Sequence, residues 1–600
     1  MKTLQDLVSN LENKEGIAIS FGENKNELQH ITFKELYNTI NSYSRGFIEL
    51  GLQKGDSIAL FSGNNPQWLG ISLGANNTGL IDIPRAETST ANELEYILAH
   101  SKPKVLIVEN EKVLNKIDLA KHPEITSIYS IQNINGVKNI RELEKLGEQS
   151  KAKLFPVEPN DVAGRIYTSG TTADPKGVES THYNFISNVL ALQKMLHLTT
   201  KERSVSYLPP WHQFERVHKY LGTLVDMNAY YAEISSLTNA LKIQEPTIFI
   251  TVPRILIAVH DKVLDKVYKS GFGKVFEYLY PIALDYHKQN KGLKKALEYI
   301  PHKIADKLFF EKVRKAFGNK VKYLVCGSAK LPKHIEDFFV AAGMDVLEGY
   351  GLTETSPVIS ARVPGKKMYY TVGLFLEGIE GKILDPNTNE KLSKGVEGIL
   401  HVRGPNVMKG YFDNIEETNK VLTKDGWFNT GDRGYLDHEG RLSITGREKD
   451  LIKLSGGENI NPTPLEDALS ESKYIATGIV IGEDSWKNLG ALILPNFDEL
   501  KEYYKDNNMT YDENGPLRNL VETQAKNKIP EIQKLYSKEI NRLVNSDPKF
   551  KLYDHIRDFE FIEELTVGEE LTATLKIIRH KVMKKYEYLV IRMRRKMTGR

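Results

Sequence analysis

The 600-residue sequence lacks most features of secreted, membrane-spanning and nucleic-acid-binding proteins. Its only cysteine is Cys326, so neither an intramolecular disulfide nor a paired-cysteine metal site can form. No apolar run reaches the ~18 residues that a membrane-spanning helix requires, and the opening residues MKTLQDLVSNLENKEG lack the basic and apolar blocks of a secretory signal. A net charge of only +3 at pH 7 argues against nucleic acid as a partner. We therefore expect a cytoplasmic protein.

A Walker phosphate-binding loop is also absent, although residues 167–178, YTSGTTADPKGV, contain similar components. A proline precedes the lysine and a glycine follows it, whereas the Walker pattern has glycine before the lysine and Ser or Thr after it. Glycines let the backbone approach a ligand closely, and hydroxyl groups with a lysine can bind a polyphosphate. The candidate phosphate-binding residues are Thr168, Ser169, Gly170, Thr171, Thr172 and Lys176. The alternative is a surface turn between a strand and a helix that binds nothing.

Composition and the pattern of apolar residues predict an α/β fold. Because 600 residues exceed what one hydrophobic core normally serves, we expect two or more domains. Short apolar runs such as DSIALFSG, PKVLIVEN and VKYLVCGS alternate with helical patterns, which indicates mainly parallel sheets whose strands are buried on both faces. Cys326, in the last of these runs, is expected to be a buried strand residue. A capping box at Thr32 and Glu35 predicts a helix that ends near Gly51.

The second part of the chain has a different texture. From about residue 372 to 442, short strands punctuated by glycine predict a small β subdomain. After the charged segment GREKD, the pattern indicates a compact α+β module that contains a polar helical stretch. The last segment, 576–600, has ten Lys or Arg residues and one acid, Glu587. It is either a solvated tail or a patch attracted to anionic lipid, which would place the protein at the inner face of a membrane.

Two further segments contain acids that are candidates for binding a nucleotide or its metal ion. In DVLEGYGLTETSPV, Glu354 is a candidate Mg²⁺ ligand, because Mg²⁺ takes one or two carboxylates together with phosphate oxygens. Thr353 beside it could bind a phosphate. Asp432, in a TGD turn, and Arg447, fifteen positions later, suit the hydroxyl groups of a ribose. Taken alone, both segments are also compatible with ordinary surface loops.

The order of these motifs resembles that of the adenylate-forming (ANL) superfamily, which includes acyl-CoA synthetases, adenylation domains and luciferases. The chain has YTSGTTADPKG, YGLTET, TGD, GREKD and GGENINP in that order, followed by a lysine near its end. The resemblance implies an N-terminal domain of layered α/β subdomains with a small β subdomain (1–446), a hinge (447–450) and a smaller, mobile α+β lid (451–600). It also implies that ATP and an acid give an acyl-adenylate and pyrophosphate, after which a thiol displaces AMP. ATP, Mg²⁺ and CoA are thus expected.

The same resemblance assigns roles to particular residues. Lys576, in LTATLKIIRHKV, is implied to be the catalytic lysine of the lid, and Lys449 the residue about which the lid turns. The segment CGSAKLP resembles the one that stacks on adenine, where small residues let the base lie against the backbone. The remaining residues expected at the nucleotide are Gly327, Ser328, Ala329, Tyr350 and Gly351.

The segment SYLPPWHQFERVHKYLGTL indicates which acid is activated. It resembles long-chain fatty acyl-CoA synthetases and acyl-carrier-protein synthetases, which implies that His212 lies near the carboxylate or adenylate and that Trp211 walls or gates an acyl tunnel. Taken alone, His212 is more often a hydrogen-bonded structural histidine. The sequence departs from the family at Ala173 and Tyr370, where glycine is usual, and at Ala573, where proline is usual.

The sequence therefore predicts a long-chain fatty acid–CoA ligase whose substrates are a fatty acid, ATP and CoA. One alternative is the same adenylation followed by transfer to the phosphopantetheine of acyl carrier protein, since both acceptors end in the same thiol. A second alternative is a non-catalytic ATP-binding scaffold. That alternative predicts the loss of a charged catalytic group, whereas the lysines and acids of the motifs are all present.

Overall fold

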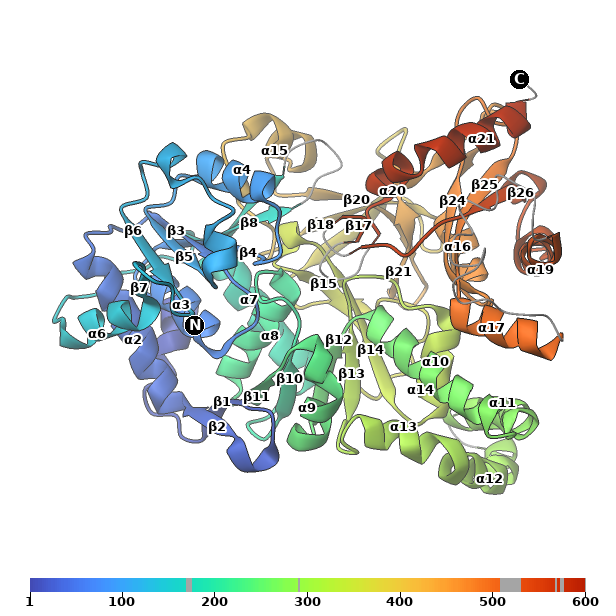
Figure 1. Ribbon diagram of the computed structural model, residues 1–600, viewed down its shortest axis with the longest axis horizontal. Coiled ribbons are helices and arrows are strands. Elements are labelled where there is room, and N and C mark those ends of the chain that lie inside the picture. The colour runs from blue at the N-terminus through green and yellow to red at the C-terminus, as the bar shows by residue number, and fades with distance from the viewer. Residues whose placement is uncertain (169–174, 290–291, 508–529, 567–568, 572–576, 599–600) are drawn as a thin grey trace. The chain divides into compact units, whose positions relative to one another are not determined.

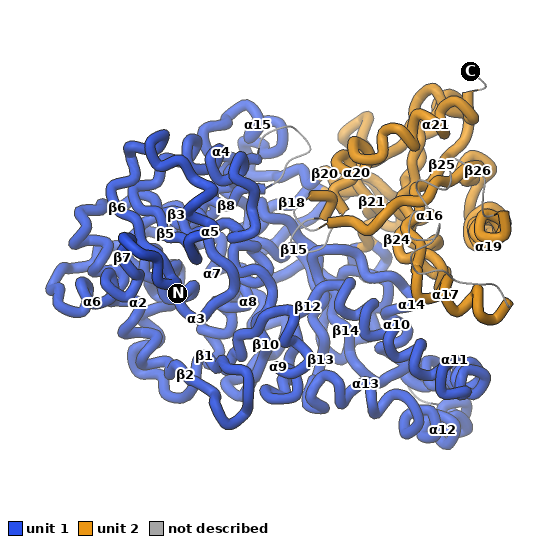
Figure 2. Tube along the Cα trace, viewed as in Figure 1, with its two compact units in different colours: residues 1–382, 401–430, 437–442 blue, residues 383–400, 431–436, 443–600 orange. Residues whose placement is uncertain are grey.

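The structure, a computed structural model, describes residues 1–168, 175–289, 292–507, 530–566, 569–571 and 577–598 (Figure 1). Helices and strands alternate along most of the chain, which confirms the predicted mixed α/β fold. Contacts divide the chain into two compact units (Figure 2): unit 1 holds 1–382, 401–430 and 437–442, and unit 2 holds 383–400, 431–436 and 443–600. The hinge that we predict at 447–450 belongs to the residues of unit 2, and the domain boundaries 446 and 451 stay a prediction.

An eight-stranded sheet runs through the N-terminal part of unit 1 in the order β19-β9-β8-β4-β3-β5-β6-β7. The strands from β8 to β7 pair in parallel, and β9 and β19 add an antiparallel edge. The bounds are β3 (Ser57–Phe61), β4 (Ile81–Arg85), β5 (Val105–Val108), β6 (Ser127–Ser130), β7 (Lys138–Asn139), β8 (Val162–Thr168), β9 (Lys176–Thr181) and β19 (Gly410–Tyr411).

Helices cover this sheet on both faces, as the apolar runs predict. On β3, Ile58 and Leu60 pack in one core cluster, and Ala59 and Phe61 pack in another, because successive side chains of a strand point to opposite faces. The first cluster includes side chains from α2 (Phe33–Glu49), α3 (Pro66–Asn76) and α6 (Ile140–Gln149), and the second from α4 (Ala91–Ser101) and α5 (Glu111–Leu114). The predicted capping box at Thr32 opens α2.

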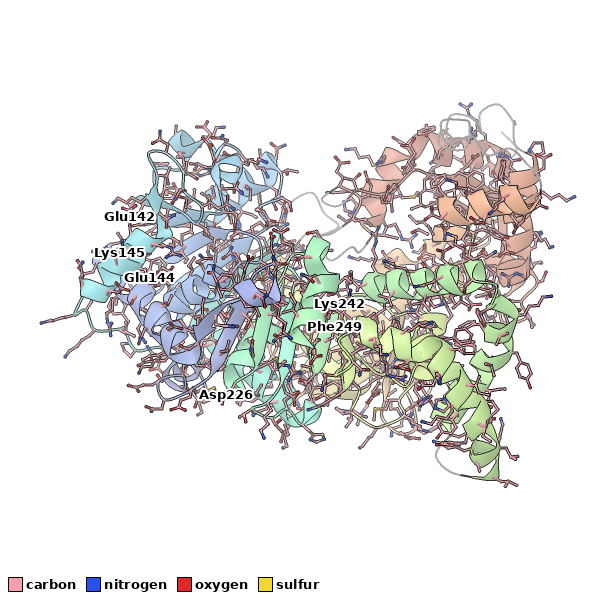
Figure 3. All side chains as sticks on the ribbon, turned by 60° about the horizontal axis from the view of Figure 1, so that its bottom comes forward. Glu142, Glu144, Lys145, Asp226, Lys242 and Phe249 are labelled. Atoms are coloured by element: carbon pink, nitrogen blue, oxygen red, sulfur yellow. The ribbon has the colours of Figure 1, made fainter. Side chains whose placement is uncertain are left out.

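Two further sheets of unit 1 have the orders β12-β13-β14-β15-β16 and β10-β11-β1-β2. Strands β12, β13 and β14 are parallel, and β12 contributes the buried Phe249 (Figure 3). Cys326 ends β13 and is buried, as predicted. The strand bounds are β1 (Ile17–Phe21), β2 (Gln29–Thr32), β10 (Arg203–Ser206), β11 (Asn228–Tyr231), β12 (Ile248–Thr251), β13 (Tyr323–Cys326), β14 (Asp345–Gly351), β15 (Val358–Ala361) and β16 (Leu374–Phe375).

The helices that belong to this part of unit 1 share one large hydrophobic core with these strands. Among them, α11 packs against α10, α12 and α14 (Figure 1). Their bounds are α1 (Leu4–Ser9), α7 (His182–Leu196), α8 (Gln213–Leu224), α9 (Leu237–Gln244), α10 (Pro253–Lys269), α11 (Gly273–Lys288), α12 (Leu293–Ala305), α13 (Glu311–Ala316) and α14 (Lys333–Ala341).

The predicted short strands between 372 and 442 are present, and the two units divide this segment between them. The bounds here are β17 (Glu380–Leu384), β18 (Gly398–Arg403), α15 (Ile415–Val421), β20 (Phe428–Leu436) and β21 (Leu442–Arg447). Later in the chain, β24 (Ile475–Ile481), β25 (Leu489–Pro495) and β26 (Ile556–Phe561) form a sheet, and β22 (Ile452–Lys453) pairs with β23 (Asn459–Ile460). The accompanying helices are α16 (Thr463–Leu469), α17 (Phe497–Asp506), α19 (Pro530–Ile540), α20 (Arg579–Lys585) and α21 (Glu587–Thr598).

The basic C-terminal segment is folded over its described residues. Leu589 and Met593 of α21 are buried in the core of unit 2. On the same helix, Arg594 pairs with Glu483 at 2.6 Å and Lys596 pairs with Asp558 at 2.9 Å. Much of the positive charge of this segment is therefore compensated within unit 2. No helix in the described part of the chain is both long enough and apolar enough to span a bilayer.

Candidate functional site

The two ends of the predicted phosphate-binding loop lie side by side in the structure. Thr168, the last residue of β8, is paired in antiparallel register with Lys176, the first residue of β9. Ser169, Gly170, Thr171 and Thr172 lie outside the described residues, and so does Ala173. Strand β9 begins at Lys176 and leads into α7. Thr168 and Lys176 are therefore positioned by the antiparallel pairing of β8 with β9.

Lys176 lies in a cluster of charged and aromatic side chains. Its Nζ pairs with the carboxylate of Glu417 on α15 and lies 5.1 Å from the centre of the Tyr411 ring. The hydrogen bond from Lys176, together with a second from Lys420, holds the pKa of Glu417 at about 2. Tyr411 in turn donates its hydroxyl proton to Oε1 of Glu354 at 2.9 Å. The structure thus links the predicted phosphate-binding lysine to the predicted metal ligand through one tyrosine.

Glu354 is positioned by backbone contacts as well as by Tyr411. It belongs to a short 3-10 turn, Thr353–Thr355, and its carbonyl accepts a hydrogen bond from the Met408 amide at 2.8 Å. Among the described residues, no group of three or more His, Cys, Asp or Glu side chains is arranged to hold a metal ion. A single half-buried carboxylate, linked through Tyr411 to the lysine predicted to bind phosphate, nevertheless fits Mg²⁺, which keeps several waters and binds through one carboxylate plus phosphate oxygens.

The glycine of the YGLTET segment is required by close packing. A Cβ atom on Gly351 would lie 1.8 Å from the carbonyl oxygen of Pro357, so no other residue fits without moving the backbone. Tyr350 and Gly351 end β14, and Thr353 begins the turn that carries Glu354. Close backbone approach therefore fixes the turn in which the two predicted ligands, Thr353 and Glu354, are found.

The predicted adenine segment follows β13, whose parallel neighbour is β14. Because the carboxyl ends of parallel strands meet at one edge of a sheet, Gly327 and the YGLTET segment lie at the same edge. A Cβ atom on Gly327 would lie 3.0 Å from Cζ of Phe214, which places this segment against α8. Ser328 has a positive φ of 70°, and its Oγ is buried without a hydrogen-bond partner among the described residues. Ala329 is exposed. An orphaned hydroxyl beside an exposed alanine fits a polar ring such as adenine.

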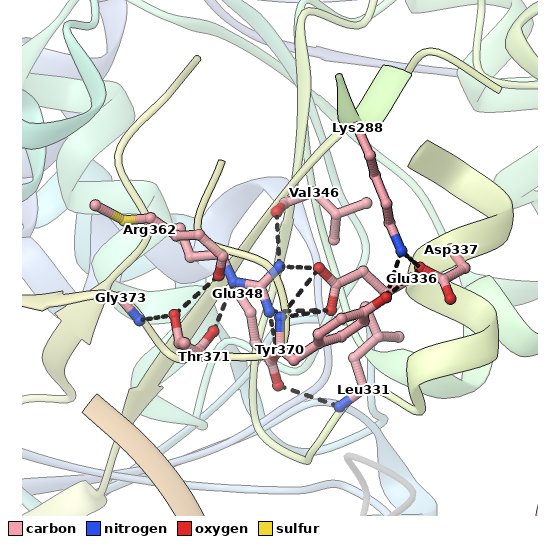
Figure 4. A network of polar contacts seen from close by, with 11 residues as sticks. Lys288, Leu331, Glu336, Asp337, Val346, Glu348, Arg362, Tyr370, Thr371 and Gly373 are labelled. Atoms are coloured by element: carbon pink, nitrogen blue, oxygen red, sulfur yellow. Dashed lines mark hydrogen bonds and ion pairs between the residues drawn. The ribbon is translucent and has the colours of Figure 1, made fainter. Parts of the chain in front are cut away.

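A buried ionic network contacts this segment through Leu331 (Figure 4). Arg362 donates to Glu336 at 2.7 Å and to Glu348 at 2.8 Å, and all three side chains are buried. Glu348 also accepts a hydrogen bond from the amide of Leu331, at the end of the adenine segment. Burial raises the pKa of Glu348 to about 7, although Arg362 acts in the opposite direction. The network joins α14, β14 and the segment after β15 to the adenine segment.

Contacts in the same region explain how a tyrosine is accommodated at position 370, where the family usually has glycine. Its φ of 61° lies in the left-handed region that favours glycine, and a side chain there costs about 1 kcal/mol or more. The Tyr370 hydroxyl donates to Asp337 at 2.6 Å, and Lys288 binds both residues (Figure 4). These contacts offset the strain of the backbone.

His212 and Trp211 lie at the start of α8. His212 is the N-cap of this helix: its Nδ1 accepts a hydrogen bond from the amide of Phe214 at 3.3 Å. A neutral His212 in this arrangement carries its ring proton on Nε2. The Trp211 ring lies 5.3 Å from the guanidinium of Arg85, which also donates to the carbonyl of Tyr167 at 2.8 Å. His212 is therefore held as a capping residue, and Trp211 is joined through Arg85 to the strand that ends in the phosphate-binding loop.

A buried ion pair fixes α8 to the eight-stranded sheet. Arg216 of α8 pairs with Asp82 of β4, and both side chains are completely buried. Removing one partner of such a pair leaves an uncompensated buried charge and costs about 3–5 kcal/mol. The position of His212, one helical turn earlier, depends on this anchor.

The predicted ribose-binding residues form an ion pair in unit 2. Nε of Arg447 lies 3.0 Å from Oδ1 of Asp432, which is nearly fully buried. The next residue along, Arg433, pairs with Glu448 at 2.7 Å. Two adjacent cross-strand pairs thus clamp the end of β21, directly before the 3-10 turn Glu448–Asp450 that contains the predicted hinge residue Lys449.

The predicted catalytic lysine, Lys576, lies outside the described residues. On the two sides of it in sequence, Leu571 and Ile577 form an antiparallel bridge. Arg579, three residues after Lys576, pairs with Glu466 at 2.5 Å and donates to the carbonyl of Val480 at 2.7 Å. The described neighbours of Lys576 are thus fixed to the core of unit 2.

Several residues of this site carry no sequence signal that would have revealed them. Glu417 and Lys176 are 241 positions apart, and Arg362 lies between two carboxylates that an isolated sequence cannot assign to it. Tyr411 belongs to the short run GYFD, which indicates a strand and nothing about its side-chain partner. Only Asp82 and Arg85 could have been suspected, as charged residues in the otherwise apolar strand β4, IDIPR.

Comparison with known families and proteins gives matches to two family models and to named relatives. A family described as AMP-binding enzyme matches residues 10–412, and one described as AMP-binding enzyme C-terminal domain matches residues 449–551. The chain is 32% identical, over 78% of its length and 73% of the relative's, to a chloroplastic long-chain-fatty-acid acyl-carrier-protein ligase of Arabidopsis thaliana. It is 30% identical to a long-chain-fatty-acid–CoA ligase of Mycobacterium bovis, over 80% of both chains.

Solved structures share the fold at lower identity. The adenylation domain of a carboxylate reductase from Mycobacterium chelonae has a TM-score of 0.77 at 17% identity, with 98% of this chain and 91% of that one covered. ATP-bound MatB from Rhodopseudomonas palustris has a TM-score of 0.72 at 20% identity, with 97% and 99% covered. These likenesses show that the chain shares the fold of these structures.

The buried network predicts a pH-dependent stability. A carboxyl group with a raised folded-state pKa keeps its proton where the unfolded chain has lost it, so its contribution is full below the unfolded value of 4.5 and declines as the pH rises to about 7. Glu348→Gln should remove this part of the decline. We expect the drop in Tm between about pH 5 and pH 7 to shrink by about 2–4 °C in thermal unfolding.

Glu380→Gln is a suitable control, because Glu380 forms an exposed pair with Arg403. This variant should follow the wild-type pH profile. Parallel Tm curves for Glu348→Gln and the wild type would contradict the assignment of the titration to Glu348.

Proposed function

The chain belongs to the AMP-binding enzyme family, within the adenylate-forming superfamily, and on this basis we propose that it is an ATP-dependent long-chain fatty acid–CoA ligase. The reaction joins a fatty acid and ATP to an acyl-adenylate and pyrophosphate, and the thiol of CoA then takes the acyl group and releases AMP. Relatives that are about one-third identical are named as long-chain fatty acid ligases, which supports the substrate class. The observation that carries the proposal is the cluster of Lys176, Tyr411 and Glu354 at the end of β8.

The proposed roles follow from the chemistry of adenylation. A carboxylate is a poor acylating agent, so its oxygen attacks the α-phosphorus of ATP, and negative charge on the phosphates must be compensated. Lys176 and the hydroxyl groups of residues 168–172 hold the phosphates. Glu354 holds Mg²⁺, which neutralises phosphate charge when bound. Lys576, from the lid, stabilises the charge that develops as the acid attacks, and the lid moves about Lys449 between the two half-reactions.

The remaining residues position the nucleotide and the acid. Asp432 accepts hydrogen bonds from the ribose hydroxyls, and its ion pair with Arg447 orients the carboxylate. The backbone at Gly327 and Ser328 receives the adenine. His212 is assigned to the carboxylate of the fatty acid, and Trp211 borders the acyl chain.

If Lys576 serves only adenylation, its role can be distinguished from those of the other site residues by measuring the two half-reactions separately. Lys576→Ala should abolish fatty-acid-dependent exchange of pyrophosphate with ATP, because the charge that stabilises the transition state is lost. The variant should still form acyl-CoA from supplied acyl-adenylate. Pyrophosphate exchange with fatty acids of short to long chain, and thioester formation from oleoyl-adenylate, are the two measurements.

Lys581→Ala, a second lysine of the same basic segment, serves as the control and should retain both half-reactions. Equal loss of both half-reactions in Lys576→Ala, with wild-type thermal unfolding, would refute the role of this lysine. Absence of any exchange by the wild type would favour the non-catalytic scaffold.

Acyl carrier protein is the alternative acceptor, and one relative is named for that activity. Because CoA and the carrier protein present the same thiol, the acceptor is decided by docking outside the acyl site. We expect CoA to be acylated from oleoyl-adenylate when both acceptors compete at equal concentration. Preferential acylation of the carrier protein, measured by separating the two thioesters, would reverse the assignment.

The ion pair of Lys176 predicts an effect on ATP affinity. Phosphate must compete with Glu417 for the lysine, so Glu417→Gln should lower the KM for ATP by up to about fivefold, the scale of a partly exposed ion pair, with little change in kcat. Glu416→Gln is the matched control, since Glu416 pairs with Lys420 at 3.0 Å. A higher KM in Glu417→Gln would mean that Glu417 orients the lysine for phosphate.

A cytoplasmic location and contact of the C-terminal segment with the inner face of a membrane stay predictions. The ion pairs of Arg594 and Lys596 reduce the charge that this segment offers to lipid. Charge reversal at Arg595 is a suitable test of this membrane contact, because Arg595 is exposed and the change leaves the buried side of α21 intact. Removal of residues 599–600 is a poorer test.

A further inference from the structure

The helix α12 carries an apolar stripe that faces solvent. Leu293, Leu297, Ile300 and Ile304 are 79%, 72%, 68% and 48% exposed. Their spacing of four, three and four positions puts them on one face of an α-helix, over about three turns. A stripe with this spacing normally packs into a core, and soluble proteins rarely leave such a contiguous apolar patch uncovered.

The neighbouring helix adds further exposed apolar groups. α11 packs against α12 (Figure 1), and its side chains Val275 and Tyr278 are exposed. Tyr299 of α12 is exposed as well. Tyrosine has an apolar ring and a polar hydroxyl, so it suits a boundary between water and an apolar phase.

The segment that contains these helices is strongly basic. Residues 266–307 contain nine lysines and four acids, a net charge of +5 from 42 residues, whereas the whole chain has only +3. Lys303 and Lys307 are exposed next to the stripe in sequence. An apolar stripe flanked by lysines is the pattern of helices that lie in the surface of an anionic membrane.

We propose that α12 is a membrane-docking helix, whose stripe of Leu293, Leu297, Ile300 and Ile304 enters the surface of an anionic lipid bilayer. Lys303 and Lys307 bind the anionic headgroups, and the aliphatic side chains enter the acyl boundary below them. A second copy of this chain fits less well, because it would bring two surfaces of net positive charge together. An acidic protein would match the lysines, but it gives no reason for four aliphatic side chains in a row along the helix.

This surface is distinct from the basic C-terminal segment, and its binding to lipid does not require the proposed enzymatic activity. If the activity is as proposed, the surface also brings the enzyme to the phase in which a long-chain fatty acid is dissolved. Binding measured without substrates therefore tests the surface alone.

The test uses flotation of the full chain with vesicles of phosphatidylcholine alone or of phosphatidylcholine with phosphatidylglycerol. The wild type should float with the anionic vesicles and much less with the neutral ones, and added salt should weaken binding. L297Q/I300Q should bind at least about tenfold more weakly, because each aliphatic side chain kept out of lipid loses severalfold in binding. K303Q/K307Q should lose most of the preference for anionic lipid.

Leu552→Gln is the matched control, because Leu552 is 72% exposed but lies outside this segment. It should float like the wild type, and all variants should retain wild-type thermal unfolding and pyrophosphate exchange in solution. Unchanged flotation of L297Q/I300Q would overturn the proposal. A dimer of the wild type that L297Q/I300Q dissociates, or binding to acidic carrier protein that this variant alone loses, would overturn it in favour of a protein partner.

Discussion

Strands buried on both faces leave only their ends where a loop can meet a ligand. In unit 1, side chains of β3 alternate between two separate core clusters, so none of them is available to a substrate. The predicted functional residues are therefore found where strands end: Thr168 at the end of β8, Gly327 after β13 and Gly351 at the end of β14. Because neighbouring strands are parallel, segments far apart in sequence reach the same edge. The rest of the site depends on this constraint.

Charge compensation then determines how the site is held. Arg216 with Asp82, and Arg362 with Glu336 and Glu348, are buried groups, which are tolerated only because each charge has partners. They anchor the helix that begins at His212 and the segment expected to receive adenine. Lys176 differs, since its partner Glu417 is partly exposed and can be displaced. Buried pairs thus set the geometry, and an exchangeable pair is left where a phosphate is expected to bind.

Whether a basic residue is available to a partner outside the chain also depends on whether an acid of the protein already compensates its charge. The C-terminal segment has the more conspicuous excess of lysine and arginine, but several of them pair with acids of unit 2. On α12 the lysines accompany uncovered aliphatic side chains, and a surface needs both properties to enter lipid. Tyr370 shows a comparable balance, because the strain of its backbone is offset by contacts of its hydroxyl group. For the basic residues and for Tyr370 alike, the role of a residue depends on which groups its side chain contacts.

The sequence by itself determined the fold class, the buried strands, the capping box of α2 and the order of the nucleotide motifs, because each is encoded within a few neighbouring residues. The tertiary structure decided the partners. It brought Glu417 and Tyr411 to Lys176, placed Arg362 between two carboxylates, and made β9 the strand that follows the phosphate-binding loop. It also left the stripe of α12 uncovered. Apolar periodicity shows that a helix has an apolar face, but only packing decides whether that face meets a core or the solvent.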